Sequence, residues 1–215
     1  MTRLALGLCL LLPAAVFAAS DPELTRHLKG VEEHYNRAKS MQLSFEETYH
    51  VQGQSGKSES GELYLRKPGR MRWDYKTPAG KLFVSDGKDA YFYTPIGNKA
   101  EKMKLKETDD MRAPLAFLLG KLEFEKEFQN LKMTREKGEV VVTAEPKSDR
   151  LPYKQVQFNI TPQFEISKLD VTGQDGSILG FRFSNEKVNP KLDEKLFTFQ
   201  LPQGAYYINP IEGER

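Results

Sequence analysis

The 215-residue sequence is poor in cysteine, with Cys9 as its single thiol. Cys9 lies inside an apolar segment at the start of the chain, which we expect to be removed. The remaining chain can therefore form no disulfide, and its stability has to come from the packing of a core. About 195 residues are enough for one sizeable core, so we expect one domain spanning residues 20–215.

Long apolar runs are also missing, except at the N-terminus. Arg3 is followed by an apolar stretch through Leu12, then by Pro13 and the small residues Ala18 and Ala19. This pattern is typical of a secretory signal peptide, which we assign to residues 1–19. The stretch is too short for a transmembrane helix of about 20 residues. A lipidated Cys9 is the less favoured alternative, because the apolar region continues well beyond it.

Charge of one sign is not in excess, since 32 Lys and Arg residues face 30 Asp and Glu residues. A nucleic-acid-binding protein needs a concentrated basic surface, so we expect no nucleic-acid partner.

Motifs of the common catalytic sites are absent as well. The sequence has no Gly-x-Ser-x-Gly elbow, His-Glu-x-x-His helix, Walker loop or Gly-x-Gly-x-x-Gly turn. Its acidic residues form no recognisable pair for acid–base chemistry. We therefore expect no enzymatic activity and no cofactor, and a hydrolase is the least favoured class.

Histidine is scarce, with three residues in the whole chain. His27 and His34 are seven positions apart, on nearly the same face of an expected helix, and could in principle share a metal ion. No third ligand follows at a suitable spacing, so we interpret both as surface histidines and expect no metal site.

What the sequence does contain begins with an amphipathic helix. Asp21 is a good N-cap and Pro22 suits the first turn. Apolar residues then recur at intervals of three and four, which predicts a helix from Pro22 to near Ser40 that covers one face of a sheet. The apolar stripe consists of Leu24, Leu28, Val31, Tyr35 and Ala38.

From Met41 onward the apolar period changes to two, which is typical of strands. Short strands at roughly ten-residue spacing predict a mainly β (α+β) fold with a barrel or a strongly curved antiparallel sheet. A last segment, Phe197–Pro202, is expected to pair with or cap an edge. The expected strands are Met41–Val51, Gly61–Pro68, Gly69–Pro78, Lys81–Ser85, Asp89–Thr94, Lys99–Lys106, Asn130–Glu136, Val140–Thr143, Tyr153–Ile160, Glu165–Thr172 and Ile178–Asn185.

One segment breaks the strand pattern. Asp109 and Asp110 can cap a short helix over Met111–Leu119, with Gly120 as its stop. This helix is apolar on all sides and so has to be buried on several sides. We expect it to form a lid against the concave face of the sheet.

Large side chains gather between Tyr64 and Tyr93. Met71, Trp73 and Tyr75 alternate with charged residues, so they share one face of a strand. An ordinary core explains any single one of them. Together with the apolar lid they indicate a core that can also serve as the wall of a binding site.

Three segments carry a resemblance to a known family. GELYLRKPGRMRWDYKTP, KLFVSDGKDAYFYTP and FTFQLPQGAYYI occur in this order. They resemble the periplasmic outer-membrane lipoprotein carrier proteins, the LolA family, and the resemblance extends over nearly all of the mature chain. It implies an incomplete, strongly curved antiparallel β-barrel with covering helices that form a lid over a hydrophobic cavity.

The resemblance also implies a function. Members accept acylated lipoproteins from an inner-membrane ABC lipoprotein exporter, shield the acyl chains in the periplasm, and pass the cargo to an outer-membrane lipoprotein receptor. A monomer is expected. The acyl-chain-binding residues implied here are Leu63, Leu65, Met71, Trp73, Tyr75, Phe83, Phe92, Leu115, Phe117 and Leu118.

The family also has a basic residue before the proline that helps to hold the closed lid. The matching position is Lys67, where many relatives have Arg, so the latch is expected to be looser or to involve Arg66. Two alternatives stay open: a lipid-binding periplasmic sensor or shuttle of the same fold that handles a different lipid, and an integral outer-membrane barrel.

Overall fold

A computed structural model describes residues 21–51, 56, 58–105 and 121–208 of the chain. The expected signal peptide and the expected lid helix Met111–Leu119 lie outside the described residues. Within the described residues, no helix is both long enough and apolar enough to cross a membrane.

The strands form one open sheet of twelve strands, in the order β12-β6-β5-β4-β3-β2-β1-β11-β10-β9-β8-β7. Neighbours are antiparallel except for β12 and β6. The strands are β1 (Ser40–His50), β2 (Ser58–Arg66), β3 (Arg70–Thr77), β4 (Leu82–Asp86), β5 (Asp89–Thr94), β6 (Lys99–Lys104), β7 (Phe128–Glu136), β8 (Glu139–Pro146), β9 (Tyr153–Ile160), β10 (Ile166–Gly173), β11 (Ile178–Val188) and β12 (Tyr206–Tyr207).

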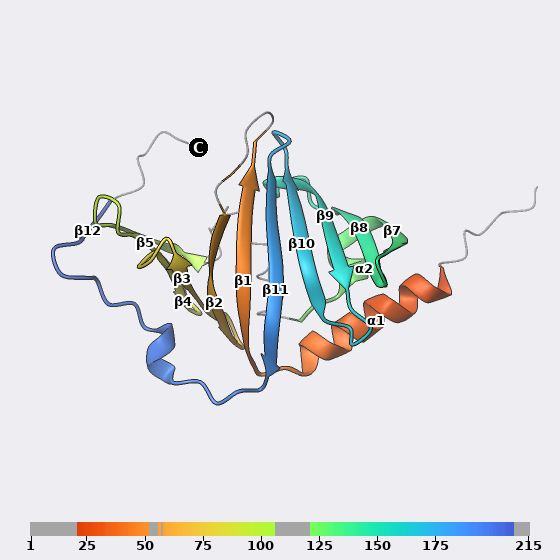
Figure 1. Cartoon of the computed structure of the whole chain (residues 1–215), viewed down its shortest axis with the longest axis horizontal. Helices are drawn as coiled ribbons and strands as arrows, with labels where there is room; N and C mark the ends of the chain where they lie inside the picture. Colours follow the sequence, from red (N-terminus) through yellow and green to blue (C-terminus); the bar gives the residue numbers. More distant parts are fainter. Residues whose placement is uncertain (1–20, 52–55, 57, 106–120, 209–215) are drawn as a thin grey trace, which may run out of the picture.

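The first strand lies in the middle of this sheet, where β1 pairs with both β2 and β11. One half of the sheet is therefore a meander of β1 to β6, and the other half is a meander of β7 to β11. The sheet is strongly curved, with β1 and β11 standing in front of the strands at either end in Figure 1. The predicted mainly β fold with a curved antiparallel sheet is confirmed, and all eleven predicted strands are present.

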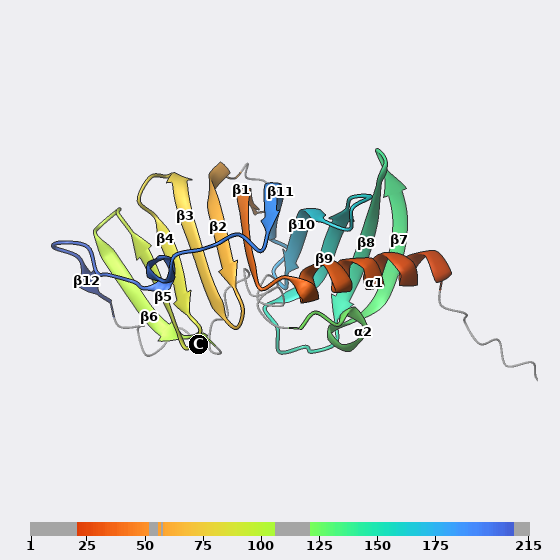
Figure 2. The same ribbon diagram turned by 90° about the horizontal axis from the view of Figure 1, so that it is seen from below.

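Helix α1 (Pro22–Arg37) begins as predicted, with the Asp21 carboxylate accepting the backbone N–H of Glu23 at 2.9 Å. It ends three residues earlier than expected, because Ala38 is already extended and β1 starts at Ser40. The apolar stripe of α1 is buried at Leu28, Val31 and Tyr35. Figure 2 shows α1 crossing the β7–β9 part of the sheet, which confirms its covering role.

A short helix that the sequence pattern did not predict, α2 (Phe124–Glu127), packs beside α1. The Glu32 side chain of α1 accepts the backbone N–H of Phe124 at 2.7 Å, and Asn36 exchanges two hydrogen bonds with the backbone of Leu122. Both Leu122 and Phe124 are fully buried. The segment before β7 therefore extends the cover over this half of the sheet.

The C-terminal segment differs from its prediction. It forms a 3-10 helix, η3 (Glu194–Phe197), beside β3 and β4, and the edge pairing is made by β12 rather than by Phe197–Pro202. Arg72 of β3 donates to the carbonyl of Leu196 at 3.3 Å, and the Phe199 ring stacks on Tyr91 at 5.0 Å. These contacts use side chains of the strand face opposite to Trp73, so the segment covers the outer face of the sheet.

Candidate functional site

A row of apolar side chains crosses one face of the sheet. Residues that pair directly in antiparallel strands carry their side chains on the same face. From β5 to β1 the successive pairs are Phe92 with Phe83, Phe83 with Trp73, Trp73 with Leu63, and Leu63 with Leu43. All five belong to or pack against one hydrophobic cluster. We call this face the inner face, because α1 also packs on it.

A second row lies on the other half of the sheet, and it meets β1 at Glu47, which pairs with Phe181. Phe181 pairs with Leu169, Leu169 with Phe158, and Phe158 with Val142, from β11 to β8. These four side chains are fully buried and belong to the same cluster. Both halves of the inner face are thus lined by apolar side chains.

Trp73 is the centre of an aromatic group on this face. Its ring lies 4.7 Å from Phe45 and 5.4 Å from Phe181, and Tyr75 lies 5.0 Å from Phe45. The indole is fully buried, and its Nε1–H has no hydrogen-bond acceptor among the residues that the structure describes. A buried donor without an acceptor costs roughly 1–3 kcal/mol.

A second polar group interrupts the apolar face beside it. Glu47 breaks the apolar alternation of β1, and its side chain is buried, with the residue only 5% exposed. The hydroxyl of Tyr75 donates to its carboxylate at 2.7 Å. Lys81 lies with its ammonium 4.3 Å from the centre of the Tyr75 ring. In the sequence, Glu47 stands out as a single acidic residue on the apolar side of β1. Its hydrogen bond with Tyr75 could not be predicted from that position.

Lys67 lies in the turn between β2 and β3 and reaches back to α1. Its ammonium donates to the carbonyl of Tyr35 at 2.9 Å, in the last turn of the helix, and the same carbonyl accepts the backbone N–H of Ala38 at 3.2 Å. Burial lowers the pKa of Lys67 from its ordinary value. Arg66 is bound elsewhere, to Glu194 and the Leu192 carbonyl near η3. A contact of Lys67 with the expected lid stays a prediction, because that segment lies outside the described residues.

The structure places the sequence-predicted binding residues on the inner face as far as it describes them. Leu63, Leu65, Met71, Trp73, Tyr75 and Phe83 are buried in the cluster, and Phe92 packs partly buried against it. Their contact with an acyl chain stays a prediction. Leu115, Phe117 and Leu118 lie outside the described residues. Further members of the same wall, which the sequence analysis did not include, are Leu43, Phe45 and Phe181.

One prediction about histidine was wrong. His27 is not a surface residue: it is 6% exposed, and its Nδ1–H donates to the carbonyl of Glu23 at 2.8 Å. The helix face that carries it also meets the ring of Phe164, whose centre lies 6.0 Å from that of the imidazole. A histidine on an amphipathic helix is easily taken for a surface residue when its contacts come from a distant loop.

Comparison with known proteins decides the family. The model of the family described as "Outer membrane lipoprotein carrier protein LolA" matches residues 36–200. The chain belongs to the LolA family.

Curated relatives carry the same description at moderate identity. The outer-membrane lipoprotein carrier protein of Nitrosospira multiformis is 29% identical over 150 residues, which cover 70% of this chain and 72% of the relative. That of Aliivibrio salmonicida is 27% identical and covers 95% of this chain and 97% of the relative. An uncharacterized conserved protein from Thermus thermophilus has a similar fold, with a TM-score of 0.53 at 11% identity over 86% of this chain and 98% of its own.

Membership of the LolA family agrees with the site geometry. The match spans the inner-face residues of β1 to β5 and the Lys67 turn. It ends at Gln200, inside the segment that covers the outer face.

Proposed function

We propose that this LolA-family protein carries acylated lipoproteins across the periplasm, shielding their acyl chains from water between the inner and the outer membrane. The observation that carries the proposal is the set of apolar side chains that lines the inner face, with one or more from each of the strands β1–β5 and β8–β11. No catalytic step belongs to this function.

The free energy of acyl-chain burial suits such a carrier. Each methylene removed from water contributes roughly 0.8 kcal/mol, so one long chain yields about 10 kcal/mol when fully buried. A carrier also has to release its cargo. If Leu115, Phe117 and Leu118 of the lid fill the cavity in the empty protein, cargo has to displace them, and this cost offsets part of the gain.

The buried N–H of Trp73 refines the class of ligand. An ester or amide carbonyl at the head of an acyl chain is an acceptor, whereas a plain hydrocarbon is not. Such a carbonyl at Trp73 would complete a hydrogen bond that the described structure leaves unmade. The site therefore suits ester- and amide-linked acyl chains.

The partners follow from the route of the cargo. An inner-membrane ABC lipoprotein exporter would load the carrier, and an outer-membrane lipoprotein receptor would unload it. The protein would act as a monomer in the periplasm after removal of residues 1–19, with residues 20–215 as one domain.

The test is release of a radiolabelled lipoprotein from spheroplasts or inner-membrane vesicles, with the purified mature protein as the only acceptor. We expect a soluble one-to-one complex, and no release of the same lipoprotein lacking its acyl chains. Phe92→Gln should reduce release, because Phe92 lies on the inner face. Ile96→Gln is the matched control, since Ile96 is 79% exposed in the β5–β6 turn.

Two outcomes contradict the proposal. Binding of acylated lipid without release of lipoprotein would assign the protein to sensors or shuttles of a different lipid. If the protein neither binds acylated lipid nor releases lipoprotein, it shares with the carriers only their fold.

A further inference from the structure

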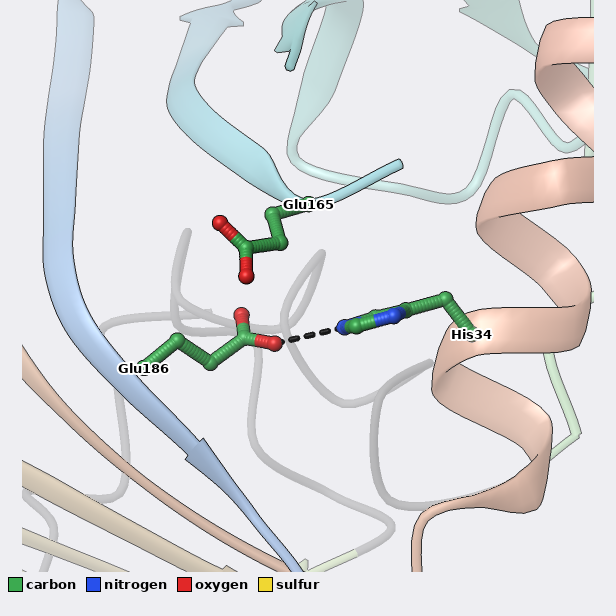
Figure 3. A group of neighbouring side chains, drawn as sticks. All are labelled: His34, Glu165 and Glu186. Carbon is green, nitrogen blue, oxygen red and sulfur yellow. Dashed lines mark hydrogen bonds and ion pairs between the residues drawn. The ribbon is translucent and has the colours of Figure 1, made fainter. Parts of the chain in front are cut away.

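Three side chains of types that can bind metal ions meet where α1 approaches the sheet (Figure 3). His34 comes from α1, Glu165 from the turn before β10, and Glu186 from β11. One donor atom from each lies within 4.8 Å of the other two. His34 and Glu186 are 152 positions apart in the sequence, so no local spacing could have predicted this group.

The two carboxylates are held differently. Glu186 is fixed: its side chain is 7% exposed, it accepts from His34 Nε2 at 2.6 Å, and it accepts from the hydroxyl of Tyr35 at 3.1 Å. The Tyr35 hydroxyl is itself oriented by the backbone N–H of Ile166 at 2.8 Å. Outer hydrogen bonds of this kind orient the ligands of metal centres.

Glu165 is held only by its backbone. Its backbone is fixed by Thr161, but its carboxylate has no hydrogen bond or ion pair to any other part of the chain that the structure describes. It nevertheless faces Glu186 and His34 in Figure 3. One imidazolium can neutralise only one of the two carboxylates. A divalent cation between the three groups would neutralise both.

We propose that His34, Glu165 and Glu186 form a binding site for a divalent transition metal of the Zn²⁺ class, which joins α1 to the sheet. One imidazole nitrogen with two carboxylate oxygens is a donor set that suits Zn²⁺, whereas Ca²⁺ and Mg²⁺ prefer oxygen ligands alone. The ion takes the place of the proton that His34 donates to Glu186, and water completes the four-coordinate shell.

The required adjustment is small. Zinc bonds to nitrogen and oxygen are about 2.0–2.2 Å long, so tetrahedral ligands lie roughly 3.3–3.6 Å apart. The present separations are at most 4.8 Å, so the widest exceeds this range by no more than about 1.2–1.5 Å. The half-buried Glu165 can make that movement, because no described partner holds its carboxylate. The proposed metal site lies next to the Lys67 contact, because the hydroxyl of Tyr35 donates to Glu186 and the carbonyl of Tyr35 accepts from Lys67.

The experiment measures Zn²⁺ binding to the purified mature protein near neutral pH, by titration calorimetry, with Co²⁺ absorption as a probe of tetrahedral geometry. We expect one ion per chain, a thermal midpoint that rises with Zn²⁺ concentration, and no competition from Mg²⁺. Glu165→Gln and His34→Gln should each weaken binding at least tenfold. Glu165→Gln is the safer variant for folding, because it removes no described hydrogen bond.

His50→Gln and Glu136→Gln are the matched controls, since both residues are exposed and lie outside the group. They should leave the affinity unchanged. The proposal is overturned if the wild-type protein binds no Zn²⁺, or if binding is unaffected by Glu165→Gln and His34→Gln. Neither result bears on the carrier function, because the release assay is run separately, with protein from which transition metals were removed beforehand.

Discussion

At the scale of single residues, Gly61 shows a constraint that the sequence does not reveal. A Cβ at this position of β2 would lie 2.1 Å from the backbone oxygen of Asp74 in β3. Gly61→Ala should therefore lower the free energy of unfolding by roughly 1–3 kcal/mol, because one strand has to shift. Urea unfolding measures this, with Ser58→Ala, an exposed position of the same strand, as the control. Equal stabilities of the two variants would mean that the strands separate at no cost.

Trp73 allows a test of whether the ligand carries a carbonyl group next to its acyl chain. If its N–H binds the carbonyl of the cargo, the wild-type protein should prefer ester-linked diacylglycerol probes over ether-linked dialkyl probes by roughly tenfold. Trp73→Phe should abolish this preference while both probes still bind. Phe83→Leu changes the neighbouring wall but keeps the N–H, so the preference should persist. Equal affinities in the wild type would exclude the hydrogen bond.

At the scale of elements, alternation of apolar residues predicted where the strands lie, because most strands have one buried face, as β2 and β3 show. The bounds of β5 and β9 agree with their predictions. The pairing of β1 with β11 was not predictable, since it joins segments more than a hundred residues apart. Contacts between distant elements were not predictable for the same reason. Examples are Glu186 with His34, Lys67 with Tyr35, and Phe164 with His27.

Substitution of Lys67 tests whether its hydrogen bond to the Tyr35 carbonyl holds the end of α1 against the sheet. Lys67→Met keeps the apolar stem of the side chain but removes the donor to the Tyr35 carbonyl, so the free energy of unfolding should fall by about 1 kcal/mol. Hydrogen exchange in the last turn of α1 should become faster. Lys67→Arg retains a donor and should restore most of the protection. If Lys67→Met exchanges like the wild type, the contact does not hold the helix.

At the scale of the whole molecule, the sheet is open, and its two edges are protected in different ways. β7 alternates exposed polar and charged residues such as Lys132 and Glu136, which disfavour pairing with another chain. The other edge ends in β12, which is two residues long. The apolar character of the inner face was readable from the sequence, because aromatic residues recur at strand period. That the two halves of the inner face meet at β1 and β11 could not be predicted from the sequence, because it depends on the pairing of these two strands.

The chain has one tryptophan, and it lies in the middle of that face, so its fluorescence can detect cargo bound there. Trp73 emission should be typical of a buried indole in the empty protein. Phospholipids with brominated acyl chains should quench it on binding, since heavy-atom quenching needs near contact, whereas the unbrominated lipid should not. Quenching that saturates at one lipid per chain would place the acyl chain on the inner face. Binding of the brominated lipid with undiminished emission would place it elsewhere, and the row from Phe92 to Leu43 would then be an ordinary core.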